Sequence, residues 1–266
     1  MNMDRKVAII GCGNLGIAIL EGLLDSEYTA PANITVTRRN ISALKEFENR
    51  GVVVTSDNSA AFRNAEVVLV ALKPHNILSI LEDLRDEIVQ DKHILVSLAT
   101  GVTIEQLGMA TSRELSIFRA MPNTAAFVNE SLTCICANTG DEKTLGTVRQ
   151  LFDGIGKIQI IDEELMEAAT VLGACGIAYV LRFMRAMVQG GIQIGFSSQV
   201  ASFIVNQTVN GASRLLIENE AHPEEEIDKV TTPKGCTIEG LNEMEHHGFS
   251  SALIKGIVTS FEKIEK

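Results

Sequence analysis

The chain has 266 residues, enough for one large domain or two modest ones, and 45% of them are hydrophobic while 21% are charged. This composition is ordinary for a globular protein and argues against intrinsic disorder. The formal net charge is −11 and no basic stripe compensates for it, so nucleic acid and anionic membranes are poor candidate partners. A small molecule is the favoured class of ligand.

The N-terminus and the cysteines both bear on the expected compartment. The first residues lead into an apolar run that is too short for a signal-peptide core or a membrane span. The five cysteines, at 12, 134, 136, 175 and 236, contain no C-x-x-C pair, and their odd number favours free thiols. We therefore expect a cytoplasmic protein without disulfides.

Residues 6–160 alternate short β-branched runs with amphipathic or polar stretches. Strands spaced by helices are typical of a mostly parallel α/β sheet. The predicted strands are 7–10, 34–37, 67–72, 94–98, 116–119, 132–137 and 157–161. The expected first domain spans residues 1–161.

After residue 161 the strand pattern disappears. Residues 162–195 and 197–221 show helical periodicity rich in small residues, and His222-Pro223 followed by three glutamates predicts a further helix start. An apolar helical domain of this size is readily completed by a partner subunit. We expect an all-helical second domain, residues 162–266, and a homodimer or larger homo-oligomer.

A glycine-rich fingerprint follows the first predicted strand. Gly11, Gly13 and Gly16, with Asn14 and Leu15 between the last two, form G-x-G-x-x-G and lead into a helical stretch. In a Rossmann domain these glycines allow a tight turn, an approach of the pyrophosphate to the backbone, and close packing of helix on strand. The context favours dinucleotide binding over an ordinary glycine-rich turn.

Residues beyond the fingerprint indicate which dinucleotide is bound. Where an acidic side chain would hold the ribose of NAD, the chain has Arg38 and Arg39, whose guanidinium groups suit the 2′-phosphate of NADP(H). NAD(H) as a poorer cofactor and a solvated helix start remain alternatives. Ala71, Lys73 and Pro74, which follow another strand, are also expected at the cofactor, and the alternative for Lys73 is exposure to solvent.

These motifs and several in the second half resemble the pyrroline-5-carboxylate reductase family along essentially the whole chain. The ordered signals, each quoted by its position, are residues 11–16, 71–74, 119–124, 176–179, 206–212 and 231–241. The resemblance implies an N-terminal Rossmann domain, a helical domain that dimerises, and NADPH-dependent reduction of 1-pyrroline-5-carboxylate to L-proline, the last step of proline biosynthesis.

The resemblance also implies roles for single residues. The substrate carboxylate is expected at the loop 232–237, held by Lys234, Gly235 and Cys236, and the Thr237 hydroxyl is expected to contact the ring nitrogen as the catalytic group. The alternative for Thr237 is a helix cap. Asn58 is expected at the adenosine or, alternatively, in a surface turn, and residues 121–124 are expected to shape the nicotinamide pocket.

Three departures from the family pattern fall on the expected substrate side. The segment 173–179 lacks two hydroxyls and a proline, Lys234 replaces the first of two glycines, and Ala125 replaces a proline. The sequence therefore leaves open a divergent paralogue that binds NADP(H) but reduces another imine or is a catalytically silent regulator. A 3-hydroxyacid dehydrogenase is disfavoured because residues 173–179 contain no lysine, and the five histidines show no metal-ligand spacing.

Overall fold

The computed structural model describes residues 5–264 and separates them into two compact units, one over residues 5–175 with Ile264 and one over Gly176–Lys263. Residues 1–4, in the N-terminal segment where no signal peptide is expected, lie outside the described residues. The segment 162–175, placed by sequence in the second domain, clusters with the first unit.

The first unit is built on an eight-stranded sheet of order β3-β2-β1-β4-β5-β6-β7-β8. All neighbouring strands run parallel except β6 and β7, which are antiparallel, so the expected mostly parallel sheet is confirmed. The strands are β1 Val7–Ile10, β2 Ile34–Thr37, β3 Val53–Thr55, β4 Val67–Val70, β5 Ile94–Ser97, β6 Ser116–Met121, β7 Ser131–Ala137 and β8 Gly156–Ile160.

The sheet differs from the expectation at one edge and at several strand ends. The edge strand β3 was not predicted, because its three residues are partly exposed and offer no buried apolar run. Strand β4 ends at Val70 and β5 at Ser97, earlier than predicted, while β6 continues to Met121. Strand β1 and strand β2 coincide with the prediction.

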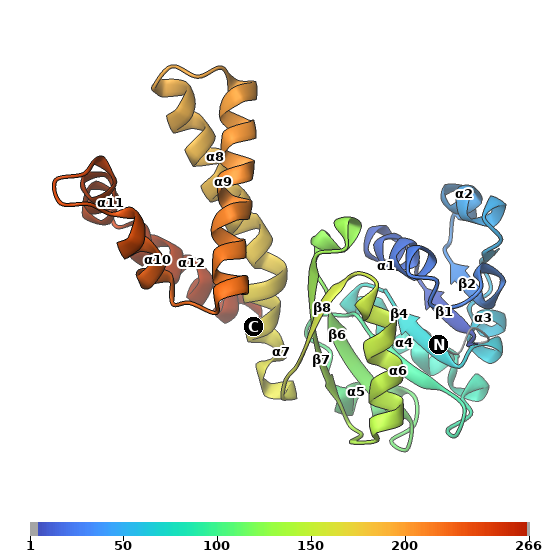
Figure 1. Cartoon of the computed structure of the whole chain (residues 1–266). Helices are drawn as coiled ribbons and strands as arrows, with labels where there is room; N and C mark the ends of the chain where they lie inside the picture. The colour runs from blue at the N-terminus through green and yellow to red at the C-terminus, as the bar shows by residue number, and fades with distance from the viewer. Residues whose placement is uncertain (1–4, 265–266) are drawn as a thin grey trace. The chain divides into compact units, whose positions relative to one another are not determined.

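Alternate side chains of the strands enter two separate hydrophobic cores, as the two-residue period of a strand requires. Ile9, Val36 and Leu69 pack with α1 and α6 on one face. Ala8, Ile10 and Val70 pack with α3, α4 and α5 on the other. Both faces of the sheet are therefore covered by helices, as Figure 1 shows.

The helices of the first unit are α1 Asn14–Asp25, α2 Lys45–Asn49, α3 Asn58–Asn64, α4 Pro74–Asp83, α5 Ile104–Ala110, α6 Glu142–Asp153 and α7 Met166–Ala169. Short 3-10 turns lie at Pro31–Asn33, Ile41–Leu44, Arg85–Glu87, Thr124–Val128 and Glu163–Leu165. After α7 the chain continues through a π-helical segment, Thr170–Cys175, which sequence periodicity did not reveal. Single π-helical turns inside α-helices are rare and frequently occur at functional sites.

The second unit is entirely helical, as predicted. Its helices are α8 Gly176–Gln193, α9 Ser198–Asn219, α10 Pro223–Val230, α11 Cys236–His246 and α12 Phe249–Ile264. The predicted helix start at His222-Pro223 is confirmed, since His222 Nδ1 accepts a hydrogen bond from the Glu224 amide. Tyr179 on α8 and Ser260 on α12 share a 2.6 Å hydrogen bond between their hydroxyls.

Large apolar side chains of the second unit face outward in the single chain. On α9, Phe203 is 74% exposed and Ile217 is 72% exposed. Among the described residues, one continuous helical run, Glu163–Gln193, is long and apolar enough to cross a membrane by length and composition alone. Such a helix is also what a subunit interface requires, so this property alone does not assign a membrane.

Candidate functional site

The fingerprint turn directly follows β1 and is hydrogen-bonded to the carboxyl end of β2. The Gly11 amide donates to Thr37 Oγ1 at 3.1 Å, and the Cys12 amide donates to the Thr37 carbonyl at 2.7 Å. Gly11 has φ +84°, and a Cβ there would lie 2.5 Å from Leu72 Cδ2. Only glycine fits this turn without strain or displacement of a neighbour.

Gly16 and Gly13 are required for different reasons. A Cβ at Gly16 would lie 3.3 Å from Ile9 Cγ2, so this glycine allows α1 to pack closely on β1. A Cβ at Gly13 would come no closer than 3.9 Å to any described residue other than its chain neighbours, and the φ of this residue is an ordinary −89°. Among the described residues, then, neither close packing nor the backbone conformation requires glycine at position 13, and the open space fits an approaching pyrophosphate.

Helix α1 begins directly behind this space. Its N-cap is Gly13, which provides no side-chain cap, and its first turn contains no acidic residue. The first amides of the helix are thus available to an anion, which the positive end of the helix dipole also favours. Asn14 is exposed and Leu15 is half-buried at this helix start.

The two arginines follow the end of β2. Arg38 is half-buried and Arg39 is exposed, and neither forms an ion pair with another residue in the described part of the chain. The Arg38 amide donates to the Thr55 carbonyl at 3.3 Å, which brings the end of β2 beside the turn that carries Asn58. Asn58 is the first residue of α3, and Asp57 caps that helix by accepting from the Ala60 amide.

The remaining predicted cofactor residues follow β4. The Ala71 amide donates to the Ile10 carbonyl at 2.8 Å, Lys73 is the exposed N-cap of α4, and Pro74 is its first residue. Because β1, β2 and β4 are parallel neighbours, the residues that follow them gather at one edge of the sheet. This edge is where open α/β sheets bind ligands.

Cys12 lies within the fingerprint but does not qualify as a nucleophile. Its burial raises the pKa of the thiol to about 12, although the nearby positive charge of Arg38 acts in the opposite direction. A thiol that stays protonated at neutral pH is a small apolar spacer rather than a reactive group.

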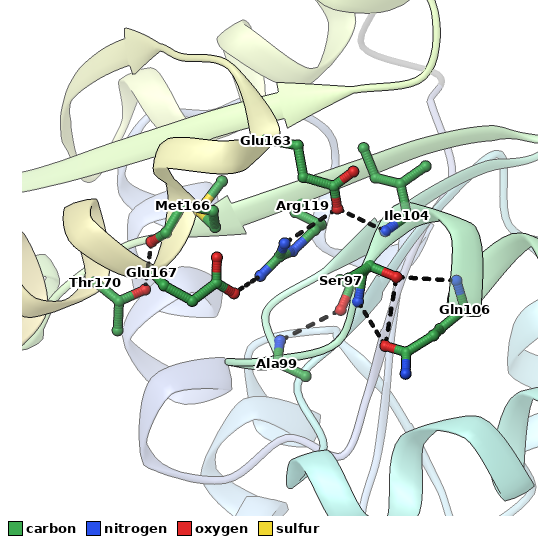
Figure 2. Close-up of polar contacts among 10 residues, drawn as sticks. Ser97, Ala99, Ile104, Gln106, Arg119, Glu163, Met166, Glu167 and Thr170 are labelled. Carbon is green, nitrogen blue, oxygen red and sulfur yellow. Dashed lines mark hydrogen bonds and ion pairs between the residues drawn. The ribbon is translucent and has the colours of Figure 1, made fainter. Parts of the chain in front are cut away.

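A buried ion-pair cluster at β6 was missed by sequence reasoning, and Figure 2 shows it. The Arg119 side chain is only 3% exposed and pairs with Glu163 at 3.0 Å and with Glu167 at 2.7 Å. Glu163 also accepts a hydrogen bond of 2.7 Å from the Ile104 amide at the start of α5. An arginine inside an otherwise apolar strand was the one available signal, because a buried charge needs a partner.

The loop expected to hold the substrate carboxylate lies in the second unit, between α10 and α11. The Gly235 amide donates to the Thr232 carbonyl at 2.9 Å, and Lys234 has φ +61°, the left-handed region that glycine would adopt more easily. Gly235 is the N-cap of α11, so Thr237 is the second residue of the helix and not its cap. The side chains of Lys234, Cys236 and Thr237 are exposed, and the Thr237 hydroxyl forms no hydrogen bond with another described residue.

The described residues contain no group of three or more histidine, cysteine or acidic side chains arranged to hold a metal ion. The groups that could hold a ligand at the sheet edge and in the loop before α11 are polar side chains and backbone amides. Arginine, lysine, asparagine and threonine supply the polar groups.

Comparison with known proteins agrees with this arrangement. Residues 163–266 match the family model described as pyrroline-5-carboxylate reductase dimerisation, and residues 6–101 match the model described as NADP oxidoreductase, coenzyme F420-dependent. The first unit thus contains an NADP-binding domain of known type, and the helical region is a dimerisation region.

Full-length relatives have the same name. The chain is 41% identical over 272 residues to pyrroline-5-carboxylate reductase 1 of Dictyostelium discoideum, covering 98% of this chain but about half of that longer protein, 49%. It is 37% identical over 279 residues to pyrroline-5-carboxylate reductase 2 of the same organism, covering 99% of this chain and 93% of that one.

A solved structure shows the same fold. The crystal structure of Plasmodium falciparum pyrroline carboxylate reductase with NADP bound has a TM-score of 0.89 and 24% identity, and the match covers 98% of this chain and 97% of that chain. The relatives above establish that the chain belongs to the pyrroline-5-carboxylate reductase family of NAD(P)-dependent oxidoreductases.

Proposed function

We propose that this protein reduces 1-pyrroline-5-carboxylate to L-proline with NADPH as the hydride donor. The observation that carries the proposal is the open space at Gly13 in front of the uncapped start of α1, in a chain whose relatives along its whole length are named pyrroline-5-carboxylate reductases. A pyrophosphate that binds in this space would account for the glycine, which no contact among the described residues requires.

The proposed cofactor site follows the sheet edge described above. Gly11, Gly13 and Gly16, with Asn14 and Leu15, form the pyrophosphate turn, and the first amides of α1 bind the phosphate oxygens. Arg38 and Arg39 pair with the 2′-phosphate, which favours NADPH over NADH because no carboxylate stands there for the ribose of NADH. Asn58 lies beside the adenosine, and Ala71, Lys73 and Pro74 line the edge after β4.

The proposed reaction needs positioning more than acid catalysis. NADPH supplies a hydride to C5 of the substrate ring, and the C5–nitrogen double bond becomes a single bond whose nitrogen keeps the proton that made the imine electrophilic. The protein's residues fix the ring and hold its carboxylate, which is how most of the acceleration arises in reactions of this type.

The proposed substrate contacts come from the loop before α11. The amides of Gly235 and Cys236 and the ammonium of Lys234 bind the carboxylate, and the Thr237 hydroxyl accepts the ring N–H. Support comes from the free hydroxyl of Thr237 and from the absence of a side-chain cap at the start of α11 among the described residues. Lys234 has a positive φ, so the loop keeps a backbone conformation suited to glycine although the residue is a lysine.

The same lysine favours a second candidate function. A long cationic side chain at the position of a family glycine narrows the loop, which would suit a reductase for another cyclic imino acid or a protein that binds NADP(H) without turnover. If a cyclic imino acid of another ring size is reduced faster than 1-pyrroline-5-carboxylate, the altered specificity is favoured. If NADPH binds tightly and no cyclic imino acid is reduced, a regulator is favoured.

The proposed assembly is a homodimer or a larger homo-oligomer. The apolar side chains that α9 exposes in the single chain, Phe203 and Ile217 among them, belong to the region matched by the dimerisation model. All five cysteines are free thiols, which supports a reducing compartment such as the cytoplasm.

The test is the steady-state rate of NADPH oxidation with 1-pyrroline-5-carboxylate, measured for the wild type, Thr237→Ala and Thr237→Ser. Loss of one positioned hydrogen bond predicts that Thr237→Ala lowers kcat/KM by roughly tenfold or more, whereas the retained hydroxyl of Thr237→Ser restores most of the rate. Equal rates in all three proteins would remove Thr237 from the proposed site. An inactive wild type that still binds NADPH would contradict the proposed substrate.

A further inference from the structure

Three alternate residues, two in the last part of β6 and one just after it, contact the segment that follows β8. Arg119 pairs with Glu163 and Glu167, Met121 shares an apolar cluster with Met166, and Asn123 Nδ2 donates to the Gly173 carbonyl at 3.2 Å. Positions 119, 121 and 123 share one face of extended chain, because side chains alternate with a period of two. We call these three residues the β6 contact row.

The contact row holds the helical segment at both of its ends. Arg119 and Met121 contact its first part, where Met166 lies between Glu163 and Glu167, and Asn123 contacts the π-helical part through Gly173. The carbonyl oxygen of the same side chain is also hydrogen-bonded. Asn123 Oδ1 accepts from the Ala125 amide at 2.9 Å and so fixes the turn that starts at Thr124. Asn123 is buried, and its two side-chain hydrogen bonds are at least partly shielded from solvent.

The hydrogen bond from Asn123 to Gly173 is made to the π-helical segment and requires a side chain that can donate. A π-helical turn departs from the regular bonding pattern of an α-helix, and here the Gly173 carbonyl accepts a side-chain donor from a residue fifty positions earlier in the chain. An asparagine amide is the matching donor. A carboxylate of the same shape has none and would repel the carbonyl.

We propose that Arg119 and Asn123 are positioning residues for hydride transfer: they fix the loop 122–124 against the helical segment 163–175. This rests on the proposed function together with the expectation from the sequence that residues 121–124 shape the nicotinamide pocket. The residues act through the loop and do not touch the reacting atoms. Displacing the loop misaligns the reacting groups while leaving the phosphate and ribose contacts at β1 and β2 intact.

The test uses Asn123→Asp, which keeps the shape and the Oδ1 acceptor and removes only the donor to Gly173. The matched control is Asn138→Asp. Asn138 lies beside the opposite end of β6, where its Oδ1 accepts from Ile117 and its Nδ2 donates to the Leu115 carbonyl, both at 2.9 Å. The control loses the same type of bond at the far end of the same strand.

The measurements are kcat per NADPH-binding site, the Kd of NADPH, and amide hydrogen exchange of peptides covering 121–128 and 166–175. Asn123→Asp is expected to lower kcat per site by about tenfold to a hundredfold, to leave the Kd of NADPH within about twofold, and to speed exchange in both peptides. Asn138→Asp is expected to match the wild type in kcat per site and in the exchange of 166–175.

If Asn123→Asp does not fold, Arg119→Lys replaces it, because a lysine keeps the charge but cannot bridge both glutamates as the guanidinium fork does. Unchanged kcat per site and unchanged exchange would overturn the proposal, and so would equal losses in the Asn138→Asp control. If the wild type binds NADPH but does not turn over 1-pyrroline-5-carboxylate, the proposed function fails. The role in hydride transfer then fails with it, and exchange tests the structural part of the inference: faster exchange in 166–175 of Asn123→Asp supports the fixing of the loop by Asn123, and unchanged exchange overturns it.

Discussion

Replacement of two fingerprint glycines by alanine is predicted to have different effects: Gly11→Ala lowers the stability of the fold, and Gly13→Ala lowers the affinity for NADPH. At Gly11, φ is +84° and the new Cβ would lie 2.5 Å from Leu72 Cδ2. The backbone conformation costs an alanine about 1–2 kcal/mol and the forced repacking about 1–3 kcal/mol, so the free energy of unfolding falls by about 2–5 kcal/mol. For a domain of this size that corresponds to a decrease in Tm of roughly 4–20 °C.

At Gly13 the same substitution places the new Cβ no closer than 3.9 Å to any described residue beyond the chain neighbours, and the backbone angles suit alanine. The slightly poorer N-cap and the smaller entropy of the unfolded chain offset each other, so the free energy of unfolding stays within about 1 kcal/mol of the wild type. The methyl group instead occupies the space assigned to the pyrophosphate. An overpacking cost of about 1–3 kcal/mol would raise the Kd of NADPH by roughly 5- to 150-fold.

The assay is a pair of measurements on each protein: thermal unfolding without ligand, and NADPH binding followed by the change in nicotinamide fluorescence. Gly11→Ala should unfold at a clearly lower temperature, and Gly13→Ala should keep its Tm and lose affinity. The reasoning is refuted if Gly13→Ala binds NADPH as the wild type does. It is equally refuted if both variants lose the same amount of stability.

Two further predictions concern cofactor choice and acid stability. The double variant Arg38→Gln with Arg39→Gln should raise the KM for NADPH by roughly 5- to 150-fold and change the KM for NADH little, because only NADPH carries the 2′-phosphate; equal losses with both cofactors would count against that site. His93 is buried beside Phe62, its Nδ1 accepts from the Val89 amide, and burial lowers its pKa to about 4. The unfolded state therefore binds a proton that the folded state does not, and as pH falls from about 6.5 towards 4 the free energy of unfolding should decrease, by at most about 3 kcal/mol. Urea unfolding at both ends of this range should show the loss in the wild type and a smaller one in His93→Phe, and the same pH slope in both proteins would contradict the assignment.

Local patterns in the sequence were sufficient for most of the cofactor domain. The β-branched runs at β1 and β2 are flanked by the fingerprint and by Arg38, so each strand and the residues after it could be located from adjacent positions. Parallel pairing then brings the ends of these strands to one edge, a consequence of topology rather than of any single residue. The expected edge of the sheet followed from that rule.

Contacts between distant segments were not predictable in the same way. Arg119 and Glu167 are far apart in the chain, and no periodicity couples a charge inside a strand to a carboxylate in a later helix. The π-helical segment Thr170–Cys175 has an apolar sequence that an α-helix would also accept, so its geometry follows from tertiary contacts such as that of Gly173 with Asn123. Strand β3 was missed because it is short and partly exposed. It is held by parallel pairing with β2, which its own sequence does not reveal.

The central claim is the reaction, and its most direct test is the stoichiometry of turnover by the wild-type protein supplied with NADPH and 1-pyrroline-5-carboxylate. The account predicts that each NADPH lost, followed by its absorbance, is matched by one L-proline formed, measured by amino-acid analysis of the same reaction. Binding of NADPH without formation of proline would contradict the account and would leave the altered loop at Lys234 as the mark of a different function.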